Sequence, residues 1–143
     1  MGAQKQYVES GGFSQYLYHQ VGDIIRDGEV EGKVIKHITD LNKGLPMYSN
    51  TSKIYFRLNE NGEVDQCRVY VDRVAYLDFD WGHSHRNKRD RRVFQRGIVH
   101  VQAYKIKDGV PWRDSFNARS MNNEEMRKFG RILKKACPTV KFK

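Results

Sequence analysis

The sequence predicts an α+β domain in which an antiparallel sheet of about four strands is packed by an N-terminal and a C-terminal helix. Segments between residues 53 and 106 alternate apolar and polar side chains, a pattern typical of strands with one buried face. Segments near both ends instead place apolar residues three or four positions apart, as amphipathic helices do. With 143 residues the chain has the length of a single domain (1–143), in which residues 1–12 are expected to be flexible.

The N-terminal helix is expected from Phe13 to Ile25, ending near Asp27-Gly28. Its apolar residues follow a mostly helical spacing: Phe13, Tyr16, Leu17, Val21, Ile24 and Ile25. A strand is expected over Val30–Ile38. Residues 42–52 contain Gly, Pro, Asn and Ser and therefore predict a loop.

The clearest local prediction is a β-hairpin. Residues 53–58 and 64–71 both alternate apolar and polar side chains, and Asn61-Gly62 between them favours the positive φ angles of a tight turn. Further strands are expected over 75–81 and 98–106. In the first, one face carries Leu77, Phe79 and Trp81 and the other Asp78 and Asp80. In the second, one face carries Val99, Val101 and Ala103 and the other His100, Gln102 and Tyr104.

The C-terminal helix is expected over Asn123–Ala136. Asn122 with Glu125 three residues later forms a capping-box spacing, and Pro138 prevents the helix from continuing. Its apolar stripe comprises Met126, Phe129, Ile132, Leu133 and Ala136. The opposite face is basic, with Arg127, Arg131, Lys134 and Lys135.

Positive charge is concentrated in the second half of the chain. Seventeen Lys and Arg residues but only five Asp and Glu residues follow residue 82, so this part carries a net charge of +12 while the rest is slightly acidic. Such asymmetry is typical of proteins that bind a polyanion such as nucleic acid. The alternative is a charged surface that serves solubility alone.

No stretch of about 18 apolar residues predicts a membrane span, and residues 1–12 lack the apolar core of a signal peptide. We therefore expect a cytoplasmic protein, or one delivered into the cytoplasm of a target cell by another route, with no membrane partner. Cys67 and Cys137 have no metal-type spacing and are expected to be free thiols.

Residues 86–96, called here the basic loop, link the last two predicted strands. They contain five Arg, one Lys and one Asp. Arg contacts phosphates through paired hydrogen bonds, and each phosphate contact releases counterions. Trp81 beside the loop would offer a ring for base stacking, unless it belongs to the core. The residues expected to bind nucleic acid are Arg86, Lys88, Arg89, Arg91, Arg92, Trp81, Arg127, Arg131, Lys134 and Lys135.

Three histidines accompany the basic loop: His83, His85 and His100. Cleavage of RNA needs a base for the 2′-hydroxyl, an acid for the leaving 5′-oxygen and cations for the transition state, and histidine can serve as either acid or base. We expect His100, held on a strand facing a groove, to be the most important catalytic residue. His83 or His85 would be its partner, and Arg96 would be among the cations. Alternatively, the histidines are incidental polar residues.

A metal centre is the competing interpretation of the same region. Zn²⁺ or Mn²⁺ could be bound by ligands drawn from Asp78, Asp80, His83, His85 and His100. The adjoining basic loop, however, has a net charge of +5, which opposes a divalent cation. We therefore expect no metal and no other cofactor.

Six short motifs follow one another between residues 53 and 104: Ile54-Tyr55-Phe56-Arg57-Leu58, Asn61-Gly62, Arg68-Val69-Tyr70, Asp78-Phe79-Asp80-Trp81, His83-Ser84-His85 and Val99-His100-Val101-Gln102. In order and spacing they resemble the C-terminal toxin domains of bacterial polymorphic toxins. Two departures are that residues 72–75 replace a Gly-Arg-Ala turn and that Gln102 replaces a second histidine. The resemblance implies nuclease activity, often on RNA.

Together these patterns favour a small basic, nucleic-acid-directed protein: a metal-independent ribonuclease-like toxin domain and candidate endoribonuclease. Its partners would be RNA rather than DNA and an acidic immunity or inhibitor protein. Two alternatives stay open. One is a non-enzymatic nucleic-acid-binding accessory protein of a phage or mobile element, and the other is an interaction module for an acidic protein.

Overall fold

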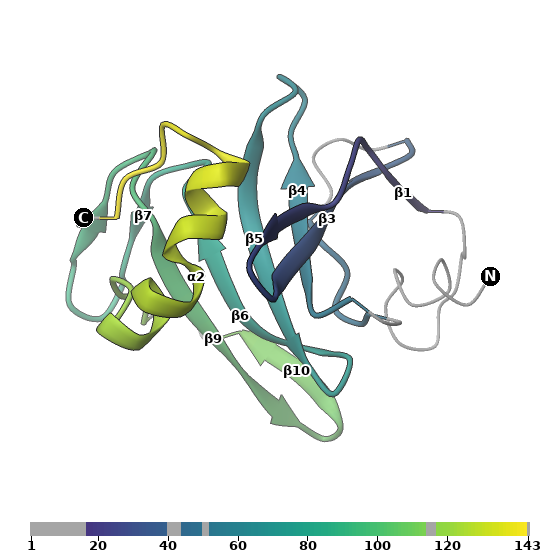
Figure 1. Ribbon diagram of the computed structural model, residues 1–143. Helices are drawn as coiled ribbons and strands as arrows, with labels where there is room; N and C mark the ends of the chain where they lie inside the picture. The colour runs from purple at the N-terminus through teal and green to yellow at the C-terminus, as the bar shows by residue number, and fades with distance from the viewer. Residues whose placement is uncertain (1–16, 40–43, 50–51, 114–116, 143) are drawn as a thin grey trace.

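A mixed sheet of eight strands dominates the computed structural model, which describes residues 17–39, 44–49, 52–113 and 117–142 (Figure 1). The described elements, in chain order, are β1 (Tyr18–Gln20), β2 (Ile25–Asp27), β3 (Val30–His37), β4 (Ile54–Leu58), β5 (Val64–Val71), β6 (Val74–Asp80), β7 (His85–Arg86), β8 (Val93–Phe94), β9 (His100–Lys107), β10 (Val110–Arg113) and α2 (Asn123–Ala136). The sheet order is β1–β3–β4–β5–β6–β9–β10, with β2 also paired to β3. β3 and β4 run parallel, whereas β7 and β8 form a separate small hairpin.

This architecture corrects the expected α+β fold of about four strands between two helices. Within residues 17–27 the predicted helix Phe13–Ile25 is wrong, because β1 and β2 form there and pair antiparallel with β3. Its first part, 13–16, lies outside the described residues. Gly22 has a φ of 70°, which interrupts any helix. Apolar residues three or four apart also suit two short strands joined by a turn, and pairing with β3 decides between the two.

The other predicted elements are confirmed with small shifts of their ends. The hairpin corresponds to β4 and β5, the strands 75–81 and 98–106 to β6 and β9, and Val30–Ile38 to β3. The C-terminal helix is α2, and both hydrogen bonds of the capping box between Asn122 and Glu125 are present. The basic loop is therefore held between two well-paired strands, β6 and β9.

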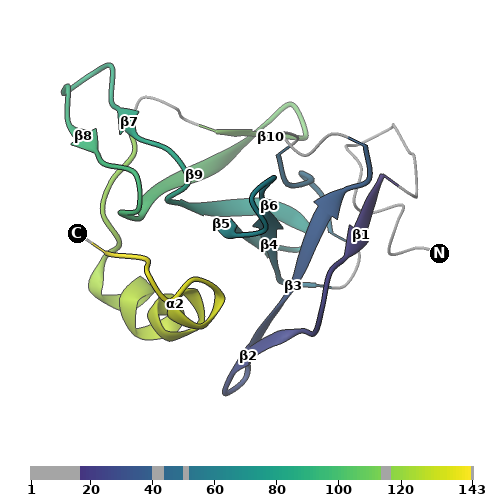
Figure 2. The same cartoon turned by 90° about the horizontal axis from the view of Figure 1, so that it is seen from above.

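One face of the sheet carries the apolar core. Phe56, Cys67, Phe79 and Val101 lie opposite one another across four neighbouring strands. Phe129 of α2 packs on Phe79 with ring centroids 5.3 Å apart, so α2 covers this face. Figure 2 shows α2 on one side of the sheet and the β7–β8 hairpin on the other. The opposite face is thus left for the polar side chains of the same strands.

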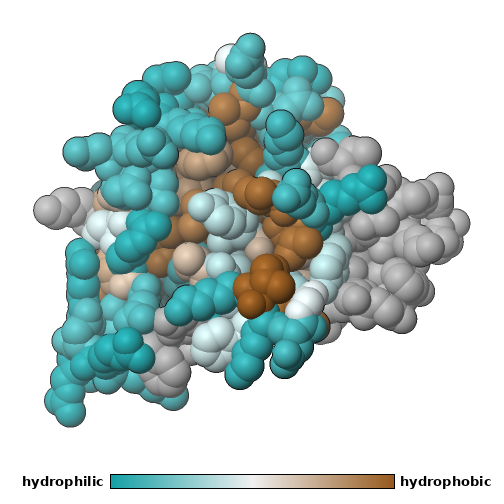
Figure 3. All heavy atoms as spheres, turned by 90° about the horizontal axis from the view of Figure 1, so that it is seen from below, coloured by the Kyte–Doolittle hydropathy of each residue, from teal (hydrophilic) through white to brown (hydrophobic). Residues whose placement is uncertain are grey.

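The β9–β10 hairpin extends beyond the rest of the sheet and exposes apolar side chains. Ile106, Val110 and Trp112 are each more than half exposed, at 60%, 53% and 52%. Figure 3 views the molecule from this end and shows apolar surface between hydrophilic side chains. Among the described residues β10 is the last strand of the sheet, and unpaired edges of this kind can accept a further strand.

Candidate functional site

Two rows of polar side chains cross the sheet face opposite α2. Antiparallel pairing of β6 with β9 places Asp78 opposite Gln102 and Asp80 opposite His100. On the other side of β6, β5 places Arg68 opposite Asp78. Because alternate residues of a strand share a face, all five side chains lie on one face, and all five are buried. Buried polar groups need hydrogen-bond or ion-pair partners. The partners of each of these five side chains therefore show whether it has a structural role or is available for a ligand.

Asp78 accepts hydrogen bonds from three side chains, and the four residues form what we call the arginine network. Arg68 donates from Nε at 2.6 Å and Nη2 at 3.0 Å, the Tyr104 hydroxyl at 2.8 Å and Arg113 Nη1 at 3.0 Å. Arg68 also donates to the carbonyl of Leu45. Burial by itself raises the pKa of Asp78, but Arg68 and the other donors outweigh it, so this pKa lies below its usual value. The network is an ionised, fully partnered structure.

Asp80 lies two residues further along the same face and lacks such partners. Among the described residues its one ion-pair contact is with His83, whose Nδ1 is 3.6 Å from Asp80 Oδ1. The pKa of Asp80 is raised to about 6, chiefly by burial and also by the neighbouring carboxylates of Asp78 and Asp65, against the opposing effects of His83 and Arg113. A buried carboxylate of this kind either holds a proton or needs a cation beside it.

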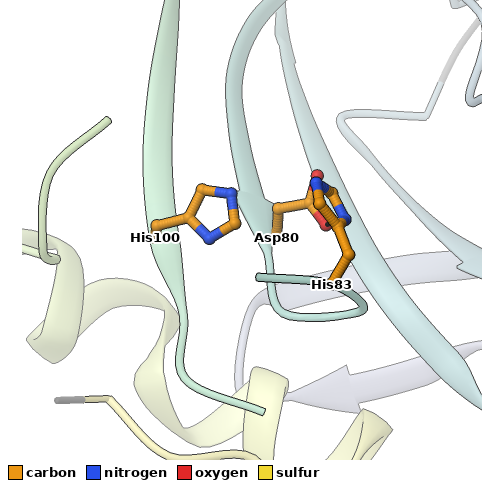
Figure 4. Close-up of side chains that lie close together, drawn as sticks. All are labelled: Asp80, His83 and His100. Carbon is orange, nitrogen blue, oxygen red and sulfur yellow. Dashed lines mark ion pairs between the residues drawn. The ribbon is translucent and has the colours of Figure 1, made fainter. Parts of the chain in front are cut away.

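His100 is fully buried, and neither of its ring nitrogens has a hydrogen-bond partner among the described residues. Three rings enclose it: His85 stacks at a centroid distance of 5.0 Å, Phe94 lies at 5.5 Å and His83 meets it edge-on at 5.7 Å. Figure 4 shows its ring directed from β9 toward Asp80. Burial, together with His85 and His83, lowers the pKa of His100 to about 4, so the imidazole is neutral at pH 7 and offers a lone pair.

The burial of His100 corrects the expectation of a groove-lining catalytic residue. The face of β9 on which His100 lies was predicted correctly. His100 shares this face with Gln102, whereas Val101 lies on the other face. His83, in contrast, is 62% exposed, and His85 is partly exposed. The two accessible imidazoles therefore cover the buried one.

A tight turn after β6 brings His83 back over Asp80. A Cβ at Gly82 would lie 2.7 Å from Cβ and Oδ2 of Asp65, so only glycine permits this close approach. Trp81 anchors the turn from within the core, where its Nε1 donates to the Val64 carbonyl at 3.0 Å. The expected use of Trp81 for base stacking is thus wrong, because its ring is covered by protein.

Asn87 fixes the tautomer of His85. Its side-chain amide donates to the Ala118 carbonyl at 2.8 Å and accepts from the Ala118 N–H at 3.0 Å, which sets the orientation of the amide. The Asn87 oxygen also lies 3.0 Å from His85 Nε2, so Nε2 must carry the hydrogen. Nδ1 of a neutral His85 is consequently the proton acceptor.

The basic loop borders this group of rings. Its six cationic residues are all exposed: Arg86, Lys88, Arg89, Arg91, Arg92 and Arg96. Arg92 lies over the Phe94 ring with its guanidinium carbon 4.7 Å from the centroid, and donates to Ser120 Oγ at 2.8 Å. Since Phe94 also contacts His100, the loop adjoins the histidines. Arg96, expected to be catalytic, follows β8 and is exposed.

The basic face of α2 does not belong to the same surface, because α2 packs on the other side of the sheet. Arg131 and Lys135 pair with Asp27 at 3.0 and 3.3 Å. Lys134 donates to the Val140 carbonyl, and Arg127 lies 3.9 Å from Glu124. The predicted nucleic-acid-binding residues thus fall into two groups that no single flat surface joins.

The sequence identified the histidines and both aspartates, but missed the groups that organise them. Arg68 and Arg113 hold Asp78, and Asn87 holds His85. Gln102, read as a missing histidine, is buried with its Nε2 unpartnered among the described residues. The pairing partners of Asp78 and Asp80 in the sheet were the available signal, since Arg68 and His100 alternate onto the same face.

Cys67 is buried in β5 and Cys137 follows α2, and both are free thiols. Among the residues that the structure describes, no helix has the length and apolar character needed to cross a membrane. No model of a protein family matches the chain, and neither a curated protein nor a solved structure is detectably similar to it.

Proposed function

We propose that this protein is a nucleic-acid-directed toxin domain that cleaves RNA as an endoribonuclease. One observation carries the proposal: two accessible imidazoles, His83 and His85, adjoin a buried carboxylate and an arginine-rich loop on one face of the sheet. Acid–base groups beside a cationic surface are what cleavage of a phosphodiester requires. The resemblance of residues 53–104 to toxin domains supports the same reaction class.

His85 is assigned as the proton acceptor. Asn87 keeps the hydrogen on Nε2, and so leaves the Nδ1 lone pair for a substrate proton. In the proposed reaction the 2′-hydroxyl of RNA gives its proton to His85 and its oxygen attacks the adjacent phosphorus. The bond from phosphorus to the 5′-oxygen breaks, leaving a 2′,3′-cyclic phosphate on one fragment.

Positive charge on the leaving-group side would come from His83 and Arg113. His83 lies with its Nδ1 3.6 Å from Asp80 Oδ1. Arg113 is anchored to Asp78 while its side chain stays 37% exposed. Its positive charge acts to lower the pKa of both Asp80 and His100. A protonated His83 would give its proton to the 5′-oxygen, and the exposed arginines of the basic loop would bind flanking phosphates.

The test is incubation of the purified protein, made without a histidine tag, with total RNA and with DNA. We expect RNA fragments ending in cyclic phosphate and intact DNA, because DNA lacks the 2′-hydroxyl. His85→Ala should lower the rate by roughly 10²–10⁴-fold, the usual contribution of a general base. His19→Ala, an exposed histidine of β1, is the matched control and should retain full activity.

Intact RNA in the presence of folded protein would end the nuclease proposal. If the same protein bound RNA with steep salt dependence, the non-enzymatic nucleic-acid-binding alternative would replace it. Full activity of His85→Ala would remove His85 from the mechanism and leave the substrate class standing.

A further inference from the structure

We propose that Asp80, His83 and His100, called here the Asp–His cluster, bind one divalent transition-metal ion such as Zn²⁺. Each residue offers one ligand atom, and these atoms lie within 4.8 Å of one another (Figure 4). This inference goes beyond the proposed function, because it stands on the three side chains alone and is tested without RNA. It also replaces the metal-free site that the sequence favoured.

The unpartnered imidazole of His100 is the first reason. A fully buried histidine normally donates or accepts at least one hydrogen bond, because burying a polar group without a partner is unfavourable. Both nitrogens of His100 lack a partner among the described residues, and its ring is directed toward Asp80. A neutral imidazole with a free lone pair is the form that binds a metal.

The charge balance around Asp80 is the second reason. Asp65 pairs with Arg57 at 2.7 Å, and Asp78 pairs with Arg68 and Arg113. Among the described residues, Asp80 has no Lys or Arg at ion-pair distance. Its ion-pair contact is with His83, and Arg113, which is bound to Asp78, acts on it from beyond ion-pair distance. A divalent ion between Asp80 and the two histidines would supply positive charge beside the carboxylate.

The ligand set and its spacing select the metal. Two imidazole nitrogens and one carboxylate oxygen suit Zn²⁺ or Mn²⁺ rather than Mg²⁺ or Ca²⁺, which prefer oxygen alone. Ligands about 2.0–2.2 Å from a zinc ion lie roughly 3.4 Å apart in a tetrahedron. The cluster must therefore close slightly on binding, and the exposed turn that carries His83 can make this movement.

The positive charge of the basic loop does not exclude the ion. The loop's cationic side chains are exposed, where water and salt screen them, whereas Asp80 and His100 are buried. A metal-bound His83 could not also give the proton that the proposed reaction assigns to it, so metal binding and that step would exclude each other in one molecule. His85 is not among the residues whose ligand atoms lie together in the cluster.

The experiment measures metal binding directly. Tag-free protein is stripped with EDTA and titrated with Zn²⁺ in competition with a chromophoric chelator, and with Co²⁺ by visible absorption. We expect one ion per chain. Even changes outside the ligand set typically cost about 10–100-fold in affinity, so Asp80→Asn, His83→Ala and His100→Leu should each lose at least about 100-fold. His19→Ala should bind as the wild type does.

The variants separate folding from binding. His83 is exposed, so His83→Ala should keep the fold even if the buried His100→Leu does not. No stoichiometric binding by the wild type, or wild-type affinity in His83→Ala and Asp80→Asn, would overturn the metal site. Metal binding without RNA cleavage would retain this inference and remove the proposed function. Cleavage that persists in EDTA, with no bound ion, would do the reverse.

Discussion

Asp78 and Asp80 stand two residues apart on one strand and on one face, are both buried, and have opposite surroundings. Asp78 accepts four hydrogen bonds from Arg68, Tyr104 and Arg113, and its pKa lies below the usual value. Asp80 has His83 at 3.6 Å, and its pKa is raised to about 6. Position on the strand alone does not decide the role of a carboxylate; the neighbouring strands do.

The comparison divides the polar face into two regions. Around Asp78 each charge has an opposite charge within hydrogen-bond distance, as a buried ion pair must to be tolerated. Beside Asp80, both ring nitrogens of His100 lack a hydrogen-bond partner in the part of the chain that the structure describes. A partnered region holds strands β5, β6, β9 and β10 together, while an unpartnered one is ready to receive a ligand, a proton or a substrate group.

The largest expected effect comes from breaking the partnered region. Asp78→Asn leaves the fully buried Arg68 without its counterion, and removal of one member of a buried pair costs about 3–5 kcal/mol. That is a large part of the roughly 5–15 kcal/mol that stabilises a typical domain. Urea unfolding followed by tryptophan fluorescence measures the loss.

Asp72→Asn is the matched control, because Asp72 lies exposed in the turn between β5 and β6. We expect its free energy of unfolding to lie within about 0.5 kcal/mol of that of the wild type. If Asp78→Asn behaves like this control, the arginine network does not hold the sheet together and the comparison fails.

The same substitution at Asp80 should have the opposite effect on stability. The raised pKa means that ionisation of Asp80 opposes folding, so the Asp80 contribution to stability falls as the pH rises from the ordinary value of 3.8 through about 6, while the lowered pKa of His100 acts in the opposite direction in both proteins. In metal-free Asp80→Asn this fall should be absent, and the unfolding free energy at pH 7 should equal or exceed that of the wild type. RNA cleavage should nevertheless drop by roughly 10²-fold or more.

Paired unfolding curves at pH 4.5 and pH 7 in EDTA provide the measurement, with cleavage assayed on the same preparation. A destabilised Asp80→Asn would indicate that Asp80 has a structural partner and that the two aspartates are alike.

The sequence predicted those parts of the fold that local pattern determines. The alternation of apolar and polar side chains, together with the Asn61-Gly62 turn, was sufficient to predict β4 and β5. The capping box placed the start of α2 correctly. The strand β10 was missed although Asp108-Gly109 is a typical hairpin turn, with φ angles of 53° and 77°. The N-terminal strands could not be found locally, because their pairing with β3 overrides an ambiguous apolar spacing.

The site was predictable in its members but not in its organisation. Strand alternation placed Asp78, Asp80 and His100 on one face, as observed. Which aspartate would meet Arg68 depends on the register between β5 and β6, which includes a bulge after Val69 that sequence periodicity does not reveal. Burial of His100 likewise follows from the rings of His85 and Phe94, which the β7–β8 hairpin brings over it.

A smaller effect is expected from Gly82→Ala, which tests how the turn positions His83. The added methyl would meet Asp65 at 2.7 Å, and overpacking of this kind costs about 1–3 kcal/mol or moves the backbone. We expect moderate destabilisation and weaker Zn²⁺ binding together. Gly44→Ala is the control, because nothing lies within 4 Å of its added Cβ. Unchanged Zn²⁺ affinity in Gly82→Ala would show that the turn does not set the position of His83.

The smallest effects concern the two basic surfaces, which extend the comparison to nucleic-acid binding. Arg89, Arg91 and Arg92 are exposed beside the histidines, so replacing all three with Gln should lower the slope of log affinity against log salt by roughly 2–3, near one per phosphate contact. The matched triple on α2 replaces Arg127, Arg131 and Lys135 with Gln. It should change the slope by less than about one, because α2 lies across the sheet and two of these side chains already pair with Asp27.

Fluorescence anisotropy with a labelled single-stranded RNA over a range of salt concentrations compares the two triples directly. Both carry the same loss of net charge, so a general electrostatic attraction would lower affinity equally in both, and only local phosphate contacts separate them. Exposed ion pairs such as those of Arg131 and Lys135 contribute little to stability, so the helix triple should stay folded and serve as a valid reference. Equal slope changes would mean that RNA contacts both sides of the sheet. The face that carries the histidines would then not be the specific binding surface.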